Sequence, residues 1–392
     1  MERNLDFDVV VDRKNTNCLK YDFAVQRGMP ADVLPLWVAD MDFQTSSYIQ
    51  DAIDKQVQHG VFGYTESDGA YFEALKSWMQ QRHNWTIQES WLVKTPGVVF
   101  ALAMAVKAFT KQGESILIQR PVYYPFGEVI QNNGRNVIDS TLQCDESGKY
   151  TMNLKDFEEK IINENVKMFF LCNPHNPVGR VWTKEELIGI GDICYRHKVM
   201  IVSDEIHADF AFARQHEVFV NLKPEYANIT ITCTAPSKTF NIAGLQISNI
   251  LIANTELKQK FQSEMLAAGY NQVNAVGMKA CQAAYQHGEE WYQTMTAYVK
   301  ENIAYLKEYL QNNIPQIKMR EPEGTYLVWI DCRGLQLSKE ALEELIVHKA
   351  KLWLDSGDMF GSAGEGFQRI NVACPRVTLA KALSQLKAAL DS

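Results

Sequence analysis

From about residue 98 onward, short apolar segments alternate with longer amphipathic segments along most of the chain. Short apolar runs are typical of buried strands, and a period of 3.6 residues is typical of helices. This alternation predicts an α/β domain with a mostly parallel sheet covered by crossover helices. The expected strands are 115–119, 167–172, 199–204, 228–232 and 249–253, and the expected helices are 98–110, 183–197, a long pair within 257–286, and 290–311.

The pattern changes near Pro315. Two short strands, 325–330 and 367–372, surround a helix at 338–349, and a last helix follows Pro375. This part of the chain predicts a smaller α+β domain. The first 45 residues carry little periodic signal, so we expect them to wrap over another part of the molecule. The predicted division is a large domain at 46–286 and a small domain formed by 1–45 together with 287–392.

Composition narrows the class of protein. The 392 residues are 46% hydrophobic, which allows a large core, but no apolar run reaches the length of a membrane span. The chain starts without the apolar segment of a secretory signal, so we expect a cytoplasmic protein that binds no membrane. Eight cysteines without a C-x-x-C pair predict reduced thiols and no metal site. The net charge of −8 argues against a nucleic acid as partner and leaves small molecules as the expected ligands.

Three apolar strands are each followed by a polar motif. Ligands collect at the carboxyl ends of parallel strands, so these motifs mark the expected site. Each motif contributes one group with useful chemistry: Asn176, Asp204 and Lys238. The motifs are CNPHNPVG at 172–179, VSDEIH at 202–207 and TCTAPSKT at 232–239.

One class of cofactor uses all three groups. An aldehyde cofactor that serves as an electron sink needs an amine to hold it, a carboxylate to keep its pyridine nitrogen protonated, and a donor to its phenolic oxygen. Lys238, Asp204 and Asn176 supply these groups. A phosphate favours backbone N–H groups at a helix start, which the segment at 95–99 offers and to which Ser237 adds a hydroxyl. The expected cofactor is pyridoxal 5′-phosphate (PLP).

Four longer motifs carry a resemblance to a known family. Over nearly its whole length the sequence resembles the fold-type I PLP enzymes of aminotransferase classes I and II. Within them it looks most like the MalY/PatB-type cystathionine β-lyases, also called C–S lyases. The resemblance implies the fold-type I PLP-dependent transferase fold, with a large α/β domain and a smaller α+β domain. The motifs are PLWVADMDF at 35–43, SDEIH at 203–207, SKTFNIAGLQ at 237–246 and GEGFQRINVACPR at 364–376.

The resemblance also implies roles for individual residues and a homodimer. Two positions depart from the wider aminotransferase pattern and point to the lyase branch: His207 replaces a usual tyrosine, and Gln246 replaces a usual phosphate-binding arginine. The implied roles are Lys238 as Schiff-base lysine, Asp204 at the pyridine nitrogen, Tyr123 stacked on the ring, Asn176 and His207 near the phenolic oxygen, Gly97, Val98, Val99 and Ser237 around the phosphate, Tyr64 at the phosphate of the partner subunit, and Arg369 on the substrate carboxylate.

The implied reaction is α,β-elimination of L-cystathionine and related cysteine S-conjugates to a thiol such as homocysteine, pyruvate and ammonia. A true aminotransferase would use the same lysine, aspartate and arginine, so these residues do not separate the two reactions. A regulatory protein that binds a partner through the same fold is an alternative of another class. Structural roles also stand beside the chemical ones: Asp204 could cap a helix, Tyr123 could pack in the core, and Arg369 could pair with a surface carboxylate.

Overall fold

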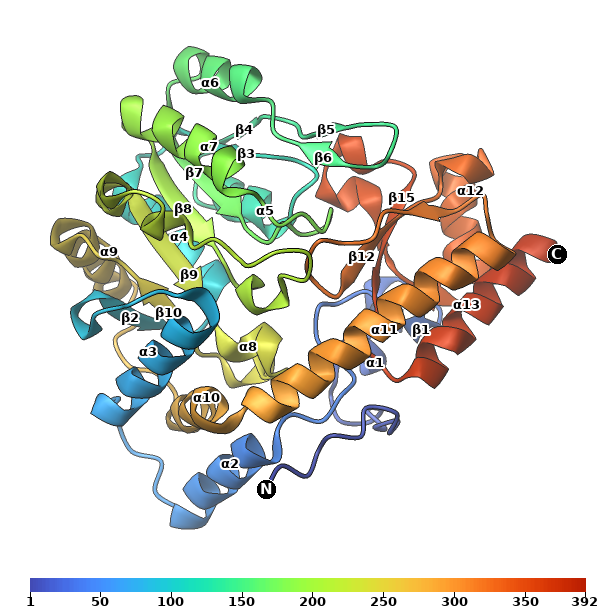
Figure 1. Cartoon of the computed structure of the whole chain (residues 1–392), viewed down its shortest axis with the longest axis horizontal. Helices are drawn as coiled ribbons and strands as arrows, with labels where there is room; N and C mark the ends of the chain where they lie inside the picture. Colours follow the sequence, from blue (N-terminus) through green and yellow to red (C-terminus); the bar gives the residue numbers. More distant parts are fainter.

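The computed structural model describes residues 1–392 and contains a central sheet of seven strands with helices on both faces (Figure 1). The strand order is β2-β10-β9-β8-β7-β3-β4. β9, β8, β7, β3 and β4 are parallel to one another, whereas β10 runs antiparallel to both β2 and β9. The prediction of an α/β protein with a mostly parallel sheet is therefore confirmed.

The bounds of the elements are as follows. The strands are β1 (Leu34–Pro35), β2 (Leu92–Thr95), β3 (Ser115–Ile118), β4 (Asn136–Asp139), β5 (Gln143–Cys144), β6 (Tyr150–Thr151), β7 (Val166–Cys172), β8 (Met200–Asp204), β9 (Thr230–Thr234), β10 (Ser248–Leu251), β11 (Lys318–Met319), β12 (Leu327–Asp331), β13 (Leu352–Trp353), β14 (Asp355–Ser356) and β15 (Phe367–Asn371). The helices are α1 (Leu19–Asp22), α2 (Ser47–His59), α3 (Gly69–His83), α4 (Val98–Phe109), α5 (Pro125–Asn132), α6 (Leu154–Asn163), α7 (Lys184–Arg196), α8 (Pro236–Thr239), α9 (Thr255–Ala267), α10 (Ala275–His287), α11 (Glu289–Asn313), α12 (Lys339–Glu343) and α13 (Arg376–Asp391).

Each face of the large sheet packs on its own set of helices. On one face, α4, α5 and α9 contribute Leu102, Phe126 and Phe261 to a buried cluster with the sheet. On the other face, α6 and α7 contribute Phe157 and Leu187 to a second cluster. Burial on both faces explains why β3 and β7 read as nearly continuous apolar runs, although the equally buried β9 alternates threonines with Ile231 and Cys233.

A smaller antiparallel sheet with the order β11-β12-β15-β14 lies in the C-terminal part of the chain. The 25-residue helix α11 runs from beside α10 to this sheet, and α13 lies along it (Figure 1). α11 buries Val299, Leu306 and Leu310 in the largest core cluster, which also contains residues of β12 and α13. One long helix therefore extends from the large domain to the small sheet and packs against it.

The N-terminal segment wraps onto the small sheet, as predicted. β1 pairs in parallel with β13, and Leu36 donates its backbone N–H to the Trp353 carbonyl at 2.9 Å. The Asn371 side chain donates to the carbonyls of Val38 and Asp40 at 2.7 and 2.6 Å. These bonds hold residues 34–40 against β13 and β15. The exact division at residues 45/46 and 286/287 stays a prediction.

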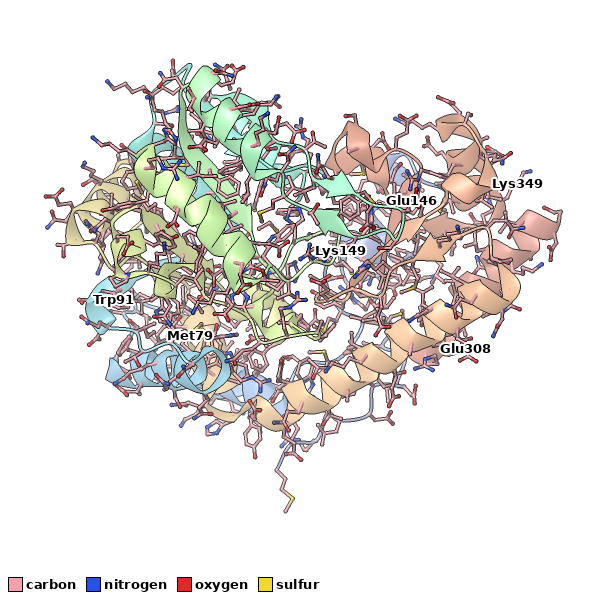
Figure 2. The ribbon with its side chains drawn as sticks, turned by 45° about the horizontal axis from the view of Figure 1, so that its top comes forward. Met79, Trp91, Glu146, Lys149, Glu308 and Lys349 are labelled. Atoms are coloured by element: carbon pink, nitrogen blue, oxygen red, sulfur yellow. The ribbon has the colours of Figure 1, made fainter.

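The hairpin β5–β6 reaches from the large sheet toward the C-terminal part of the chain. Figure 2 shows Glu146 and Lys149 of this hairpin close to that part. Arg320 donates to the Ser147 hydroxyl at 3.2 Å, and the Trp329 indole donates to the Tyr150 hydroxyl at 3.1 Å. In addition to α11, the hairpin therefore connects the two sheets through polar contacts.

Some elements differ from the sequence-based expectations. The strand expected at 228–232 is β9, which begins two residues later because a 3-10 turn occupies Pro224–Asn228. The helix expected at 338–349 is α-helical only in α12 and continues as a π-helical segment, Glu344–Lys349. β2 and β4 of the large sheet and the helices α2 and α3 were not predicted. No helix of the structure combines the length and the apolar character needed to cross a membrane.

Candidate active site

The three motifs found in the sequence meet at one edge of the large sheet. β9, β8 and β7 are neighbours in the sheet, so the residues after their carboxyl ends lie side by side. Asn176 follows β7, Asp204 ends β8, and Lys238 lies in α8, which Pro236 starts directly after β9. They line a cavity of about 190 Å³. Its other lining residues are Ala39, Pro96, Gly97, Val98, Val99, Tyr123, Cys172, Ile206, His207, Ser237, Ala243, Gln246, Ile247 and Ser248.

Lys238 is a buried amine in this cavity. Its Nζ donates to the Ala39 carbonyl at 2.7 Å, and the same carbonyl accepts from the Tyr326 hydroxyl at 3.0 Å. Burial lowers the pKa of Lys238 to about 8, and the charge of Arg369 acts in the same direction, while Asp40 opposes it. Roughly a tenth of the amine is therefore neutral at pH 7, far more than at the ordinary lysine pKa of 10.5. Only the neutral amine attacks a carbonyl carbon, so this environment suits a lysine that binds an aldehyde.

Asp204 is a buried carboxylate without a cationic partner in hydrogen-bond contact. The residue is 4% exposed, and its carboxylate accepts only one hydrogen bond, from the Ile206 backbone N–H at 3.1 Å. Burial raises the pKa of Asp204 to about 7. A protonated ring nitrogen in the cavity would supply the missing positive charge and favour the ionised carboxylate. The residue therefore fits the pyridine end of PLP.

Asn176 and His207 offer donors to the same cavity. The Asn176 Oδ1 accepts from Arg369 Nη1 at 2.9 Å, which leaves its amide N–H groups free to donate. His207 is buried, and its Nδ1 has no hydrogen-bond partner. Burial, together with the charges of Lys238 and Arg369, lowers the pKa of His207 to about 3, so the imidazole is neutral. An orphaned ring nitrogen and a free amide fit the phenolic oxygen of PLP.

The cavity also contains the start of a helix. Gly97 is the N-cap of α4, and no side chain caps the first backbone N–H groups of the helix. A Cβ added at Gly97 would meet nothing within 4 Å, so there is open space at this end. Ser237 and Gln246 line the cavity as well. Free N–H groups at a positive helix end fit a phosphate.

Arg369 lies at the edge of this cavity and is 3% exposed. It donates to Asn176 and to the Trp37 carbonyl, the latter at 2.9 Å, and it forms an ion pair with Asp355. Its Nε is buried without a partner, so the guanidinium retains a donor for a further acceptor. The alternative that Arg369 pairs with a surface carboxylate is wrong, because the side chain of Asp355 is as buried as that of Arg369.

The structure brings together the predicted residues except Tyr64. Tyr123 lines the cavity, and its backbone N–H donates to the Asn176 carbonyl at 3.0 Å. Tyr64 lies between α2 and α3, is 95% exposed and lines no part of the cavity. Sequence reasoning assigned no role to Tyr326 and Asp355, nor to Ala39, although Ala39 lies within the motif at 35–43. No local signal marks Tyr326 and Asp355, because each reaches the site through pairing with a distant segment.

Comparison with known proteins identifies the family to which a chain with this site belongs. Residues 31–386 match the family described as aminotransferase class I and II. The chain belongs to this family. A curated member, cystathionine β-lyase PatB of Bacillus subtilis (strain 168), is 39% identical over 99% of this chain and 100% of its own length. The predicted family and fold-type I architecture are confirmed.

Two solved structures of the aminotransferase class I and II fold are also very similar. A PLP-bound protein of Clostridium difficile 630, described as an aminotransferase, has a TM-score of 0.96 at 42% identity and covers 98% of this chain and 99% of its own. Cystalysin of Treponema denticola, whose structure contains PLP, has a TM-score of 0.95 at 39% identity, with 98% of each chain covered.

Proposed function

We propose that this protein is a PLP-dependent C–S β-lyase that converts L-cystathionine and water to homocysteine, pyruvate and ammonia. The observation that carries this proposal is the arrangement of Lys238, Asp204 and His207 around one cavity with Arg369 at its edge. The full-length relationship to a cystathionine β-lyase and the structural similarity to cystalysin support the β-elimination over other reactions of the family.

When bound, PLP supplies an electron sink for the charge that develops at the substrate Cα. We propose that Lys238 holds the aldehyde carbon through Nζ and, once released, removes the Cα proton. Asp204 keeps the pyridine nitrogen protonated, and Tyr123 packs on the ring. The backbone of Gly97, Val98 and Val99, together with Ser237, holds the phosphate.

Two neutral donors and one cation complete the assignment. We propose that Asn176 and His207 donate to the phenolic oxygen. Both side chains are neutral, and the amide N–H groups of Asn176 and the Nδ1 of His207 have no partner in the protein. Arg369 binds the α-carboxylate of the substrate. Its contact with the Asn176 Oδ1 orients the amide so that the donor side of Asn176 remains available.

The reaction itself is tested by incubating the purified holoprotein with L-cystathionine in the absence of any keto acid. The proposed lyase releases equal amounts of pyruvate and free thiol over many turnovers. An aminotransferase, the activity named for the Clostridium difficile structure, would stop after one turnover without a keto acid and give no pyruvate. PLP-loaded protein with neither reaction would favour the regulatory binding role.

We also propose that the protein is a cytoplasmic homodimer. All eight cysteines are free, as is common in a reducing compartment. The segment that carries Tyr64 also exposes Val61 and Phe62, at 64% and 60%. A cluster of exposed large side chains that lies outside its own cavity supports a contact with the cavity of a second chain.

Mixing two inactive variants tests whether Tyr64 acts in the partner subunit. Dimers of Tyr64→Ala alone should bind PLP at least about tenfold more weakly, because a hydrogen bond to the phosphate is lost, so at limiting PLP they should be largely empty and nearly inactive. Dimers of Lys238→Ala alone should be inactive. A mixed dimer then carries both defects in one site and none in the other, so activity should reappear at up to one site per dimer. If Tyr64 served its own subunit, mixing would restore nothing.

Replacing Arg369 with lysine should separate substrate binding from cofactor binding. Lysine keeps the charge but cannot form the planar fork that pairs with a carboxylate. We expect kcat/KM for L-cystathionine to fall by at least about tenfold, or about 1.4 kcal/mol of transition-state stabilisation, while the visible spectrum of bound PLP is unchanged. Steady-state kinetics and a spectrum of the same preparation measure both. Unchanged kinetics would assign the carboxylate to another residue.

A further inference from the structure

A second arginine, Arg27, contacts the same residue as Arg369, namely Trp37, and has no assigned role. Arg27 ends the 3-10 turn Val25–Arg27 and is exposed. Its guanidinium carbon lies 5.3 Å from the centre of the Trp37 ring. Trp37 itself is 6% exposed and stacks on Trp353, with ring centroids 4.5 Å apart and an interplanar angle of 15°. A fixed indole therefore limits the positions that the Arg27 side chain adopts.

Trp37 connects Arg27 to the substrate clamp. The Trp37 ring carries the Arg27 guanidinium, and the Trp37 carbonyl accepts from Arg369 Nη2 at 2.9 Å. The two guanidiniums thus contact the ring and the backbone of a single residue. Arg27 is placed at the outer, exposed end of this arrangement and Arg369 at its buried end.

Tyr124 gives an independent indication that the two arginines share one region. It follows Tyr123 of the cavity wall and is half-buried. Burial raises the pKa of the Tyr124 hydroxyl, and the neighbouring Asp355 acts in the same direction. The charges of Arg369 and of Arg27 both lower it. The hydroxyl therefore lies within electrostatic range of both guanidiniums.

Arg27 differs from the other arginines nearby in its charge balance. Arg369 forms an ion pair with Asp355, and Arg13 forms ion pairs with Asp40 and Asp42. Arg27 forms no ion pair and no side-chain hydrogen bond with the protein. An exposed guanidinium that is positioned by an indole and lacks a carboxylate partner is available for an anionic group of a ligand.

L-Cystathionine has such a group. It carries one amino acid head at each end, and the cleaved bond lies between them. When Arg369 binds the carboxylate of the half that becomes pyruvate, the homocysteine half with its own carboxylate must extend away from the buried end of the site. We propose that Arg27 binds this distal carboxylate and thereby favours cysteine S-conjugates with a second carboxylate over S-alkyl cysteines. The proposal rests on the β-lyase function and assigns Arg27 to specificity, not to the chemical step.

The test compares two substrates that differ at the distal end. For Arg27→Gln, we expect kcat/KM for L-cystathionine to fall at least about fivefold, mainly through KM, because a ground-state contact is lost. For S-ethyl-L-cysteine, which has no distal charge, kcat/KM should stay within about twofold of wild type. Arg196→Gln is the matched control, because Arg196 is an exposed arginine of α7 that pairs with Glu158. It should change neither substrate.

A charge reversal gives a readout that damage to the fold cannot imitate. Arg27→Glu should prefer S-(2-aminoethyl)-L-cysteine, whose distal group is a cation, and its ratio of kcat/KM for this substrate over L-cystathionine should exceed that of Arg27→Gln. An unchanged ratio, or an equal loss on all three substrates, overturns the role of Arg27. If the variants give either of these results while the wild-type protein cleaves S-ethyl-L-cysteine, the role of Arg27 is wrong but the β-lyase function stands. Wild-type protein that cleaves none of the conjugates overturns both proposals.

Discussion

Lys238→Ala protein should have no measurable turnover and should lack the visible absorption band of lysine-bound PLP. Lys238 is the only amine that lines the cavity, and its pKa of about 8 provides the neutral form that the aldehyde requires. The same Nζ is proposed to remove the Cα proton, so two functions are lost together. We expect kcat to fall at least about 1,000-fold. Pyruvate release from L-cystathionine and the spectrum of the dialysed protein measure the two losses separately.

Lys223→Ala is the matched control for this experiment. Lys223 pairs with Asp192 outside the cavity, so its loss should leave both the spectrum and the turnover within about twofold of wild type. Lys238→Ala protein with full elimination activity would contradict the proposed mechanism. Retained absorption with lost turnover would instead mean that another amine holds the cofactor.

Asp204→Asn should affect activity and stability in opposite directions. The amide cannot hold a proton on the pyridine nitrogen, so we expect kcat to fall by at least about 100-fold. The apoprotein should become more stable above pH 7. A carboxyl whose folded pKa is raised by burial stabilises the fold below its unfolded pKa, and this contribution is lost as pH rises through about 7. The change from 3.8 to about 7 corresponds to at most roughly 4 kcal/mol.

Urea denaturation of the two apoproteins at pH 5 and pH 8 measures this difference. The stabilisation by Asp204→Asn should be larger at pH 8, where the wild-type carboxyl is ionised without a partner. Asp192→Asn is the control, because bonds to Lys223 and Tyr226 lower the pKa of Asp192 despite its partial burial. Asp192→Asn should give no gain at pH 8. An equal effect of both variants on the free energy of unfolding would contradict the claim that the buried, ionised Asp204 destabilises the apoprotein.

The centre of the fold was predictable because its physical signal is local. β7 and the first part of β8 read as apolar runs because both faces are buried, whereas the equally buried β9 alternates threonines with Ile231 and Cys233, and a polar motif follows each strand. Since neighbouring parallel strands end at the same edge, the motifs alone were enough to bring Asn176, Asp204 and Lys238 together. The helix start at 95–99 and the Ser237 hydroxyl marked the phosphate end, and the resemblance to the family then supplied Arg369, His207 and Tyr64.

The parts that the sequence did not reveal depend on tertiary pairing. β2 and β4 are the edge strands of the large sheet, each has four residues, and both include polar or exposed positions, so their pattern is weak. The reversed direction of β10 leaves no trace in its composition, because an antiparallel strand that is buried reads like a parallel one. Asp355 faces Arg369 only because β14 pairs with β15 in this register.

The N-terminal segment is synthesised long before the residues that it contacts in the site. Its carbonyls at Ala39 and Trp37 accept from Lys238 and Arg369, which are made 199 and 332 residues later. Asn371, which binds Val38 and Asp40, is made later still. On the ribosome this segment therefore waits without its partners until strand β15 has emerged, and these contacts of high sequence separation form last. A nascent chain acquires its lysine well before it can hold a substrate, so binding competence coincides with the end of translation.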